Sequence, residues 1–250
     1  MKHFLLPALA LLLLVGCTAT DSNISPEEPN TVITNNDGNV NGSVVIEETA
    51  QNEINDNWVQ LFDGKTMTGW TVPTFGDDGD VDVKDGTIVI GQGDSITGIR
   101  YNKEFPKVEY EIRYEARRTG GGDFFGACTF PVKESYCTFV NSGWGGAITG
   151  LSSIDGSDAS ENSFSTYFEY KDNTWYQFRI RITNKMIQVW ITPQDKEGNW
   201  EAEQSVIELE TDDRTLSTRY EMDKYKPLGF CTYATEGQLR NIEYRKVVEQ

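Results

Sequence analysis

Charged and aromatic side chains that could bind a sugar alternate with apolar ones in three segments of the chain. In the segment 109–117, every second residue is apolar, and carboxylates and arginines lie between them. The segments 177–183 and 187–191 show the same alternation, which is typical of β-strands with one buried and one exposed face. The exposed face is predicted to include Glu111, Arg113, Glu115, Arg179, Arg181, Gln188 and Trp190.

Two interpretations of this exposed face compete. It is either a solvated surface on which Glu and Arg form cross-strand pairs, or a concave sheet that binds a carbohydrate. In the second case Trp190 stacks on a sugar ring, and Arg, Glu and Gln bond to hydroxyl groups. Because solvated faces rarely expose a ring as large as that of tryptophan, Trp190 favours the carbohydrate interpretation.

Two glycine-rich segments could form the rims of such a site. Residues 120–123 read GGGD, and residues 141–150 read NSGWGGAITG, which places Trp144 where it could stack on a ligand. Neither segment matches a phosphate-binding loop, since the first lacks the Lys-Ser/Thr pair and no helix is expected after the second. The alternative is that these glycines serve only bulges and turns.

The composition excludes several classes of function. The chain has 250 residues, 22 Lys and Arg, 39 Asp and Glu, and a net charge of −17. A surface this acidic argues against nucleic acid as a partner. The single histidine is His3, in a segment that we expect to be removed, so a catalytic triad, a His-rich zinc site and a histidine base are excluded.

The first residues predict export. Residues 1–16 combine a cationic start with a short apolar run, as in a secretory signal peptide. Residues 14–17 read LVGC and resemble a bacterial lipobox, so we expect a lipid on Cys17 that anchors the protein in the bacterial cell envelope. Residues 17–56 contain no Lys or Arg and are predicted to be a disordered acidic tether, followed by a single domain over 57–250.

From residue 58 onward the chain is predicted to be all-β. Short runs rich in Val, Ile, Tyr and Phe alternate with Gly, Asp and Asn, and no convincing amphipathic helix is present. One antiparallel β-sandwich is the simplest architecture for this pattern. The predicted strands are 81–84, 87–90, 108–117, 124–130, 136–140, 167–170, 176–183, 187–192, 206–209, 228–233 and 239–245.

The acidic loop 77–82 (DDGDVD) offers carboxylates for a Ca²⁺ ion. It fails the spacing of an EF-hand, because Val83 and Val89 stand where that motif needs Gly and Glu. A calcium site of the kind found in β-sandwiches is one interpretation, and a plain acidic surface loop is the other.

Three cysteines lie within the predicted domain. If a hairpin closes over Val132-Lys133, Cys128 and Cys137 stand opposite each other, and an exported protein permits a disulfide there. Cys231 would remain unpaired, and cross-strand disulfides are geometrically demanding. The sequence therefore leaves open whether Cys128 and Cys137 form a disulfide or remain free thiols.

A resemblance to a known family rests on the segment 58–70, which reads WVQLFDGKTMTGW. Its LFDGK sequence, Met67 and the final Gly-Trp look like the opening motif of the 3-keto-disaccharide hydrolase family. Segments at 83–88, 101–115, 175–180, 189–191 and 239–242 resemble later motifs of that family in the correct order. The resemblance covers about residues 58–246 and implies a concanavalin A-like jelly roll that acts on carbohydrates.

The resemblance also implies a reaction. A ketone at C3 of a glycoside acidifies the neighbouring C2–H, so a base can remove that proton while an acid helps to expel the glycosidic oxygen. Two carboxyl groups in unlike environments can act as this base and this acid without histidine. The candidates for acid and base are Glu111, Glu115, Asp123 and Glu169, with Arg113 or Arg179 stabilising the enolate-like charge.

The chain also departs from the pattern of this family. Where the family commonly has Gly-Gly-Asn-Ser-Gly, residues 121–126 read GGDFFG, and where it commonly has Gly-x-Gln-x-His, residues 229–233 read GFCTY. The missing histidine favours a second hypothesis, a non-catalytic glycan-binding module on the same fold. A structural or adhesive domain is the third.

Overall fold

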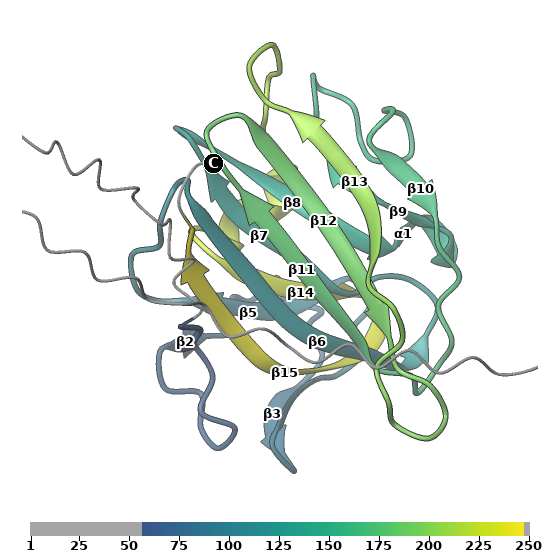
Figure 1. Ribbon diagram of the computed structural model, residues 1–250. Helices are drawn as coiled ribbons and strands as arrows, with labels where there is room; N and C mark the ends of the chain where they lie inside the picture. Colours follow the sequence, from purple (N-terminus) through teal and green to yellow (C-terminus); the bar gives the residue numbers. More distant parts are fainter. Residues whose placement is uncertain (1–56, 248–250) are drawn as a thin grey trace, which may run out of the picture. The chain divides into compact units, whose positions relative to one another are not determined.

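Two antiparallel β-sheets packed face to face make up the part of the chain that the computed structural model describes, residues 57–247 (Figure 1). The predictions of a signal peptide over 1–16, a lipid on Cys17 and a tether over 17–56 lie outside these residues. The two sheets confirm the predicted antiparallel sandwich.

The first sheet has eight strands. Its long central strands β6 and β15 pair over most of their length, although the register of this pair shifts twice. In spatial order the strands are β13 (Gln204–Glu210), β12 (Met186–Pro193), β11 (Tyr176–Ile182), β6 (Tyr110–Gly121), β15 (Thr235–Lys246), β4 (Thr87–Ile90) and β3 (Val81–Lys84), and β1 (Val59–Gln60) pairs with β15.

The second sheet has seven strands. In spatial order they are β10 (Ser165–Tyr167), β9 (Ile148–Ser152), β8 (Ser135–Ser142), β7 (Phe125–Val132), β14 (Gly229–Tyr233), β5 (Ile96–Tyr101) and β2 (Trp70–Thr71). A single turn, α1 (Gly143–Gly146), and a 3-10 helix, η1 (Tyr220–Tyr225), are the helical elements of residues 57–247. Neither of these two elements is long and apolar enough to cross a bilayer.

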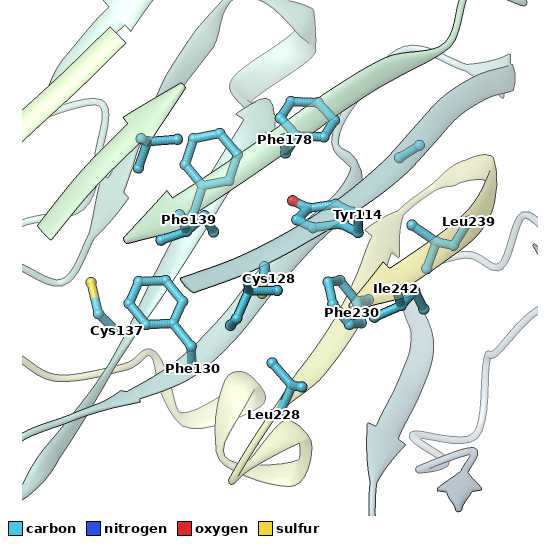
Figure 2. Packing of buried hydrophobic residues seen from close by; sticks show 14 of the residues in the cluster. Tyr114, Cys128, Phe130, Cys137, Phe139, Phe178, Leu228, Phe230, Leu239 and Ile242 are labelled. Carbon is cyan, nitrogen blue, oxygen red and sulfur yellow. The ribbon is translucent and has the colours of Figure 1, made fainter. Parts of the chain in front are cut away.

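The core lies between the sheets and follows the predicted alternation. The inward residues of β6, from Tyr110 to Ala116, are fully buried, and so are those of β11 and β12. From the opposite sheet, Phe130, Phe139 and Phe230 fill the space between the layers (Figure 2). The period-two pattern of the sequence therefore identified the buried face correctly in all three segments.

The opening motif joins the two ends of the described chain. Val59 on β1 pairs with Tyr244 on β15, and the Leu61 amide donates to the Ile242 carbonyl at 2.8 Å. The indole nitrogen of Trp70 in turn donates to the Leu61 carbonyl at 2.9 Å. These motif residues thus close the sandwich, which is a structural role.

The hairpin of β7 and β8 decides between the two states that the sequence left open for Cys128 and Cys137. The turn lies at Lys133-Glu134, one residue later than expected, and Lys133 takes up a left-handed conformation with φ 51°. This register places Cys128 opposite Phe139 and Cys137 opposite Phe130. Cys128 and Cys137 do not face each other, and both are free thiols.

Because of their burial, these thiols should be inert in the native protein. Burial raises the pKa of Cys137 to about 12 and raises the pKa values of Cys128 and Cys231 as well. The thiolate is the reactive form, so a thiol reagent at pH 8 should modify none of the three until the protein is unfolded. Mass spectrometry of the modified peptides measures this, and a disulfide-linked peptide containing Cys128 and Cys137 would contradict it.

Candidate functional site

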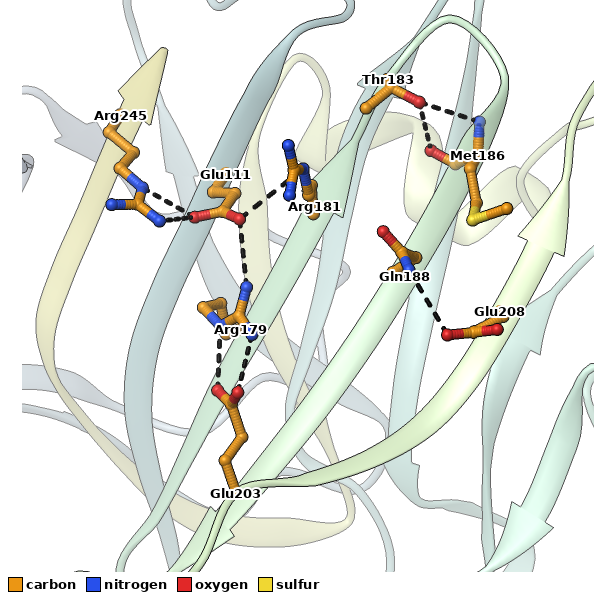
Figure 3. Close-up of polar contacts among 9 residues, drawn as sticks. All are labelled: Glu111, Arg179, Arg181, Thr183, Met186, Gln188, Glu203, Glu208 and Arg245. Carbon is orange, nitrogen blue, oxygen red and sulfur yellow. Dashed lines mark hydrogen bonds and ion pairs between the residues drawn. The ribbon is translucent and has the colours of Figure 1, made fainter. Parts of the chain in front are cut away.

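The outer face of the eight-stranded sheet brings most of the predicted site residues together. At its centre lies Glu111, whose side chain is 1% exposed. It accepts hydrogen bonds from Arg179 at 3.0 Å and from Arg245 at 2.7 Å, and Arg181 lies 3.8 Å away (Figure 3). Three guanidinium groups therefore surround one carboxylate, which leaves it little capacity to act on a substrate.

Arg179 links this centre to the edge of the sheet. It donates to both oxygens of Glu203, at 2.9 and 2.7 Å, and its guanidinium carbon lies 3.7 Å from the centroid of the Trp190 ring. Burial opposes the charge of Arg179, but the hydrogen bonds to Glu203 and the charge of Glu111 raise its pKa. The ring that was expected to bind a sugar is thus covered by an arginine.

The remaining candidates on this face also bond to one another. Glu115 accepts from Arg240 at 2.6 Å and from Asn241 at 2.8 Å. Arg113 pairs with Glu243, and Gln188 donates to Glu208 at 3.4 Å. These contacts favour the structural alternative, a sheet face of cross-strand pairs.

Two other candidates come together on the opposite side of the molecule. Asp123 and Trp144 line a hollow of about 320 Å³ on the outer face of the seven-stranded sheet, which we call the Trp144 hollow. Its floor contains buried side chains of the sheet and η1, namely Ile96, Thr138, Val140 and Met222. Its more open lining consists of Asp123, Phe124, Trp144, Arg219, Glu221 and Tyr233.

Glu169, the last predicted site residue, lies apart from both groups of candidates. It is exposed between β10 and β11, outside the lining of the Trp144 hollow.

Asp123 holds the loop that carries Trp144. Its Oδ2 accepts the Gly145 amide at 2.8 Å, and its Oδ1 accepts the Phe124 amide at 2.8 Å. Trp144 has left-handed dihedral angles (φ 52°, ψ 52°), which are costly for a residue with a side chain. The Asp123 carboxylate thus fixes a strained turn that presents Trp144, a residue that is 41% exposed, at the hollow.

The opposite part of the lining is an ion-paired cluster. Arg219 Nη1 lies 2.7 Å from Asp158 Oδ2, and its Nε lies 3.6 Å from Glu221 Oε2. Ser152 donates to Asp158 at 3.1 Å. Arg219 and Glu221 were not among the predicted site residues, because the segment around η1 shows no periodic pattern. Tyr233 is the last residue of the predicted strand 228–233, and the available signal was that it stands where the family pattern commonly has histidine.

The acidic loop 77–82 uses a carboxylate for its own turn. Asp78 accepts the amides of Phe75 and Gly76 at 2.8 and 3.1 Å. Within residues 57–247, no three His, Cys, Asp or Glu side chains gather closely enough to hold a metal ion.

Three solved structures are similar to this chain at low sequence identity. The Ca²⁺- and mannose-bound exoplasmic/lumenal domain of VIP36 has a TM-score of 0.51 at 9% identity, covering 76% of this chain and 91% of that chain. A glycosyl hydrolase family protein from Mycobacterium fortuitum has a TM-score of 0.46 at 9% identity, covering 76% and 99%. The carbohydrate-binding module CBM66 from Bacillus subtilis has a TM-score of 0.43 at 9% identity, covering 71% and 96%.

The match to a protein-family model is more informative than these structural similarities. A search of curated proteins found no significant match to the sequence. The model of the 3-keto-alpha-glucoside-1,2-lyase-like domain, in contrast, matches residues 57–244, which include nearly all of the described sandwich. This match confirms the resemblance drawn from the opening motif and identifies a carbohydrate-related domain. The chain belongs to the 3-keto-alpha-glucoside-1,2-lyase-like domain family.

Proposed function

We propose that this domain binds a glycoside in the Trp144 hollow and cleaves it when the sugar carries a ketone at C3. The observation that carries the proposal is the lining of the hollow, where exposed aromatic rings lie beside ionisable side chains. Sugar sites commonly combine such rings with a few polar groups that fix the orientation of the ligand. The lining joins two predicted residues, Asp123 and Trp144, to Arg219 and Glu221.

The family suggests an elimination, and the hollow offers groups for it. The ketone acidifies C2–H, and Glu221 is the candidate base that removes this proton. The electron pair of the C–H bond forms a C1–C2 double bond, the C1–O bond breaks, and the departing oxygen takes the proton from the carboxyl group. Arg219 would stabilise the charge that develops on the ketone oxygen. In a hydrolase, water then adds to the unsaturated ketone.

A glycan-binding module without turnover is the second candidate. Both oxygens of Asp123 accept backbone amides, so this carboxylate serves the Trp144 loop. Glu221 then remains as the main candidate for proton transfer in the lining. In either case, export and a lipid on Cys17 would place the hollow in the cell envelope, where glycosides are the expected partners.

Replacing Trp144 by alanine should weaken glycoside binding about tenfold, because the sugar loses a stacking surface. Titration calorimetry with a 3-keto-glucoside measures the affinity. Trp200→Ala is the matched control, since Trp200 is 40% exposed but lies outside the hollow. Equal losses in the two variants would contradict the assignment of the hollow.

Turnover separates the two candidate functions. If the domain is an enzyme, it converts the 3-keto-glucoside, and Glu221→Gln abolishes conversion while the variant still binds. Binding without conversion by the unmodified protein supports the glycan-binding module. If no glycoside binds, neither candidate stands.

A further inference from the structure

Arginines cover the tryptophans on the outer face of the eight-stranded sheet. Trp58, Trp175 and Trp190 each have a guanidinium group over the ring, in the range where a cation is attracted to the π face. The distances from the guanidinium carbon to the ring centroid are 4.1 Å for Arg113 on Trp58, 4.0 Å for Arg240 on Trp175 and 3.7 Å for Arg179 on Trp190. On this face, a cation of the protein itself occupies each of these rings.

Trp144 differs from these three. Within residues 57–247, no Lys or Arg stacks on its ring, although the residue is 41% exposed. It shares the hollow with two further aromatic side chains, Phe124 and Tyr233. Trp200 also has no stacked cation, but it lies outside the hollow. Phe124 and Tyr233 contact each other, with ring centroids 5.8 Å apart, so among residues 57–247 Trp144 is the aromatic side chain of the hollow that has neither a stacked cation nor a ring partner.

The ionisable groups of the hollow carry an excess of negative charge. Asp123 and Glu221 line it, and Arg219 is the only cation among its lining residues. That arginine is shared, because its closer contact is Asp158 at 2.7 Å and Glu221 lies at 3.6 Å. The hydrogen-bond donors to Asp123 are backbone amides, which do not neutralise its charge.

We infer that the preferred ligand of the Trp144 hollow is an amino sugar with a free, protonated amine. This inference rests on the proposed function and names its substrate class. The ammonium group would donate to Glu221 while the sugar ring lies against Trp144 on the other side of the hollow, and a hydrogen bond between two charged groups is about twice as strong as a neutral one. A neutral sugar cannot form this charged hydrogen bond, and an anionic sugar meets the excess negative charge.

Titration calorimetry on the full-length protein tests the preference with four probes, the methyl glycosides of glucosamine, glucose, N-acetylglucosamine and glucuronic acid. We expect the glucosaminide to bind at least tenfold more tightly than the glucoside, and the N-acetyl and glucuronic acid probes to show no such gain. Raising the pH through the pKa of the sugar amine should remove the advantage, because the neutral amine is no longer a cation.

Variants assign the preference to the hollow. Glu221→Gln keeps the shape of the side chain and removes its charge, so the affinity ratio of glucosaminide to glucoside should fall towards one. Glu208→Gln, on the eight-stranded sheet, should leave the ratio unchanged. The inference is overturned if the glucoside binds as tightly as the glucosaminide, or if Glu221→Gln keeps the ratio, and the proposed function survives either result. If none of the four probes binds and the 3-keto-glucoside does not bind either, both the amino-sugar inference and the proposed function are overturned.

Discussion

Glu111→Gln will destabilise the sandwich by about 3 kcal/mol, although it removes no atom from the core. Three arginines point at this carboxylate, and their side chains are only 16–26% exposed. Without the negative charge, the guanidinium groups repel one another in a region with little water. Because they keep some exposure, the cost falls at the lower end of the range for a broken buried ion pair. Urea unfolding at pH 7 measures the change in the free energy of unfolding.

Glu208→Gln is the matched control for this result. Glu208 lies on the same outer face, is exposed, and has a single long hydrogen bond from Gln188 at 3.4 Å. Its replacement should change stability by less than about 0.5 kcal/mol, as is usual for surface positions. If the two variants unfold at the same urea concentration, the Glu111 cluster does not stabilise the fold.

Phe178→Ala should cost about 4 kcal/mol, the largest effect that we expect from a single truncation. Phe178 is fully buried on β11, and its ring centroid lies 5.1 Å from that of Tyr114 and 5.7 Å from that of Phe139. The ring joins the inner faces of the two sheets (Figure 2), so its removal leaves a cavity that neither sheet can fill without bending. Thermal and urea unfolding measure the loss.

Tyr167→Ala provides the comparison at the surface. Tyr167 is an aromatic side chain on a strand, but it is 80% exposed on the edge strand β10. Its truncation should change stability by about 0.5 kcal/mol or less. A loss at Phe178 no larger than that at Tyr167 would mean that the core repacks around the missing ring.

Much of the fold could be predicted from the sequence because local alternation determines which face of a strand is buried. The hairpin strands β3 and β4 have the predicted bounds, since Asp85-Gly86 specifies their turn. β9 (Ile148–Ser152) escaped prediction because its first residues belong to a glycine-rich run that resembles a loop. β5 (Ile96–Tyr101) was also not predicted, and it contains Gly98, which lets the backbone of β14 approach closely.

The site was harder to predict, because alternation shows which side chains share the outer face but not whether they pair with one another, and Glu111 and Glu115, predicted to be exposed, are buried by their partners. Glu111, Arg179 and Trp190 were correctly assigned to one face, but their mutual contacts depend on the register of strands far apart in the chain. The Trp144 hollow draws on segments around residues 123, 144, 221 and 233, which only the tertiary fold brings together. Asp123 and Trp144 were found because glycines beside them indicated unusual turns.

The pairing of β1 with β15 determines when this domain can finish folding. One strand of the pair comes from the beginning of the described chain and the other from its end, so their contact closes the longest loop of the sandwich. Such non-local contacts slow folding, and they cannot form until the residues of β15 have been synthesised. β14, which carries Tyr233 and lies between β5 and β7, is subject to the same delay. A ligand can therefore meet a complete hollow only after β14 has been synthesised and has paired with β5 and β7.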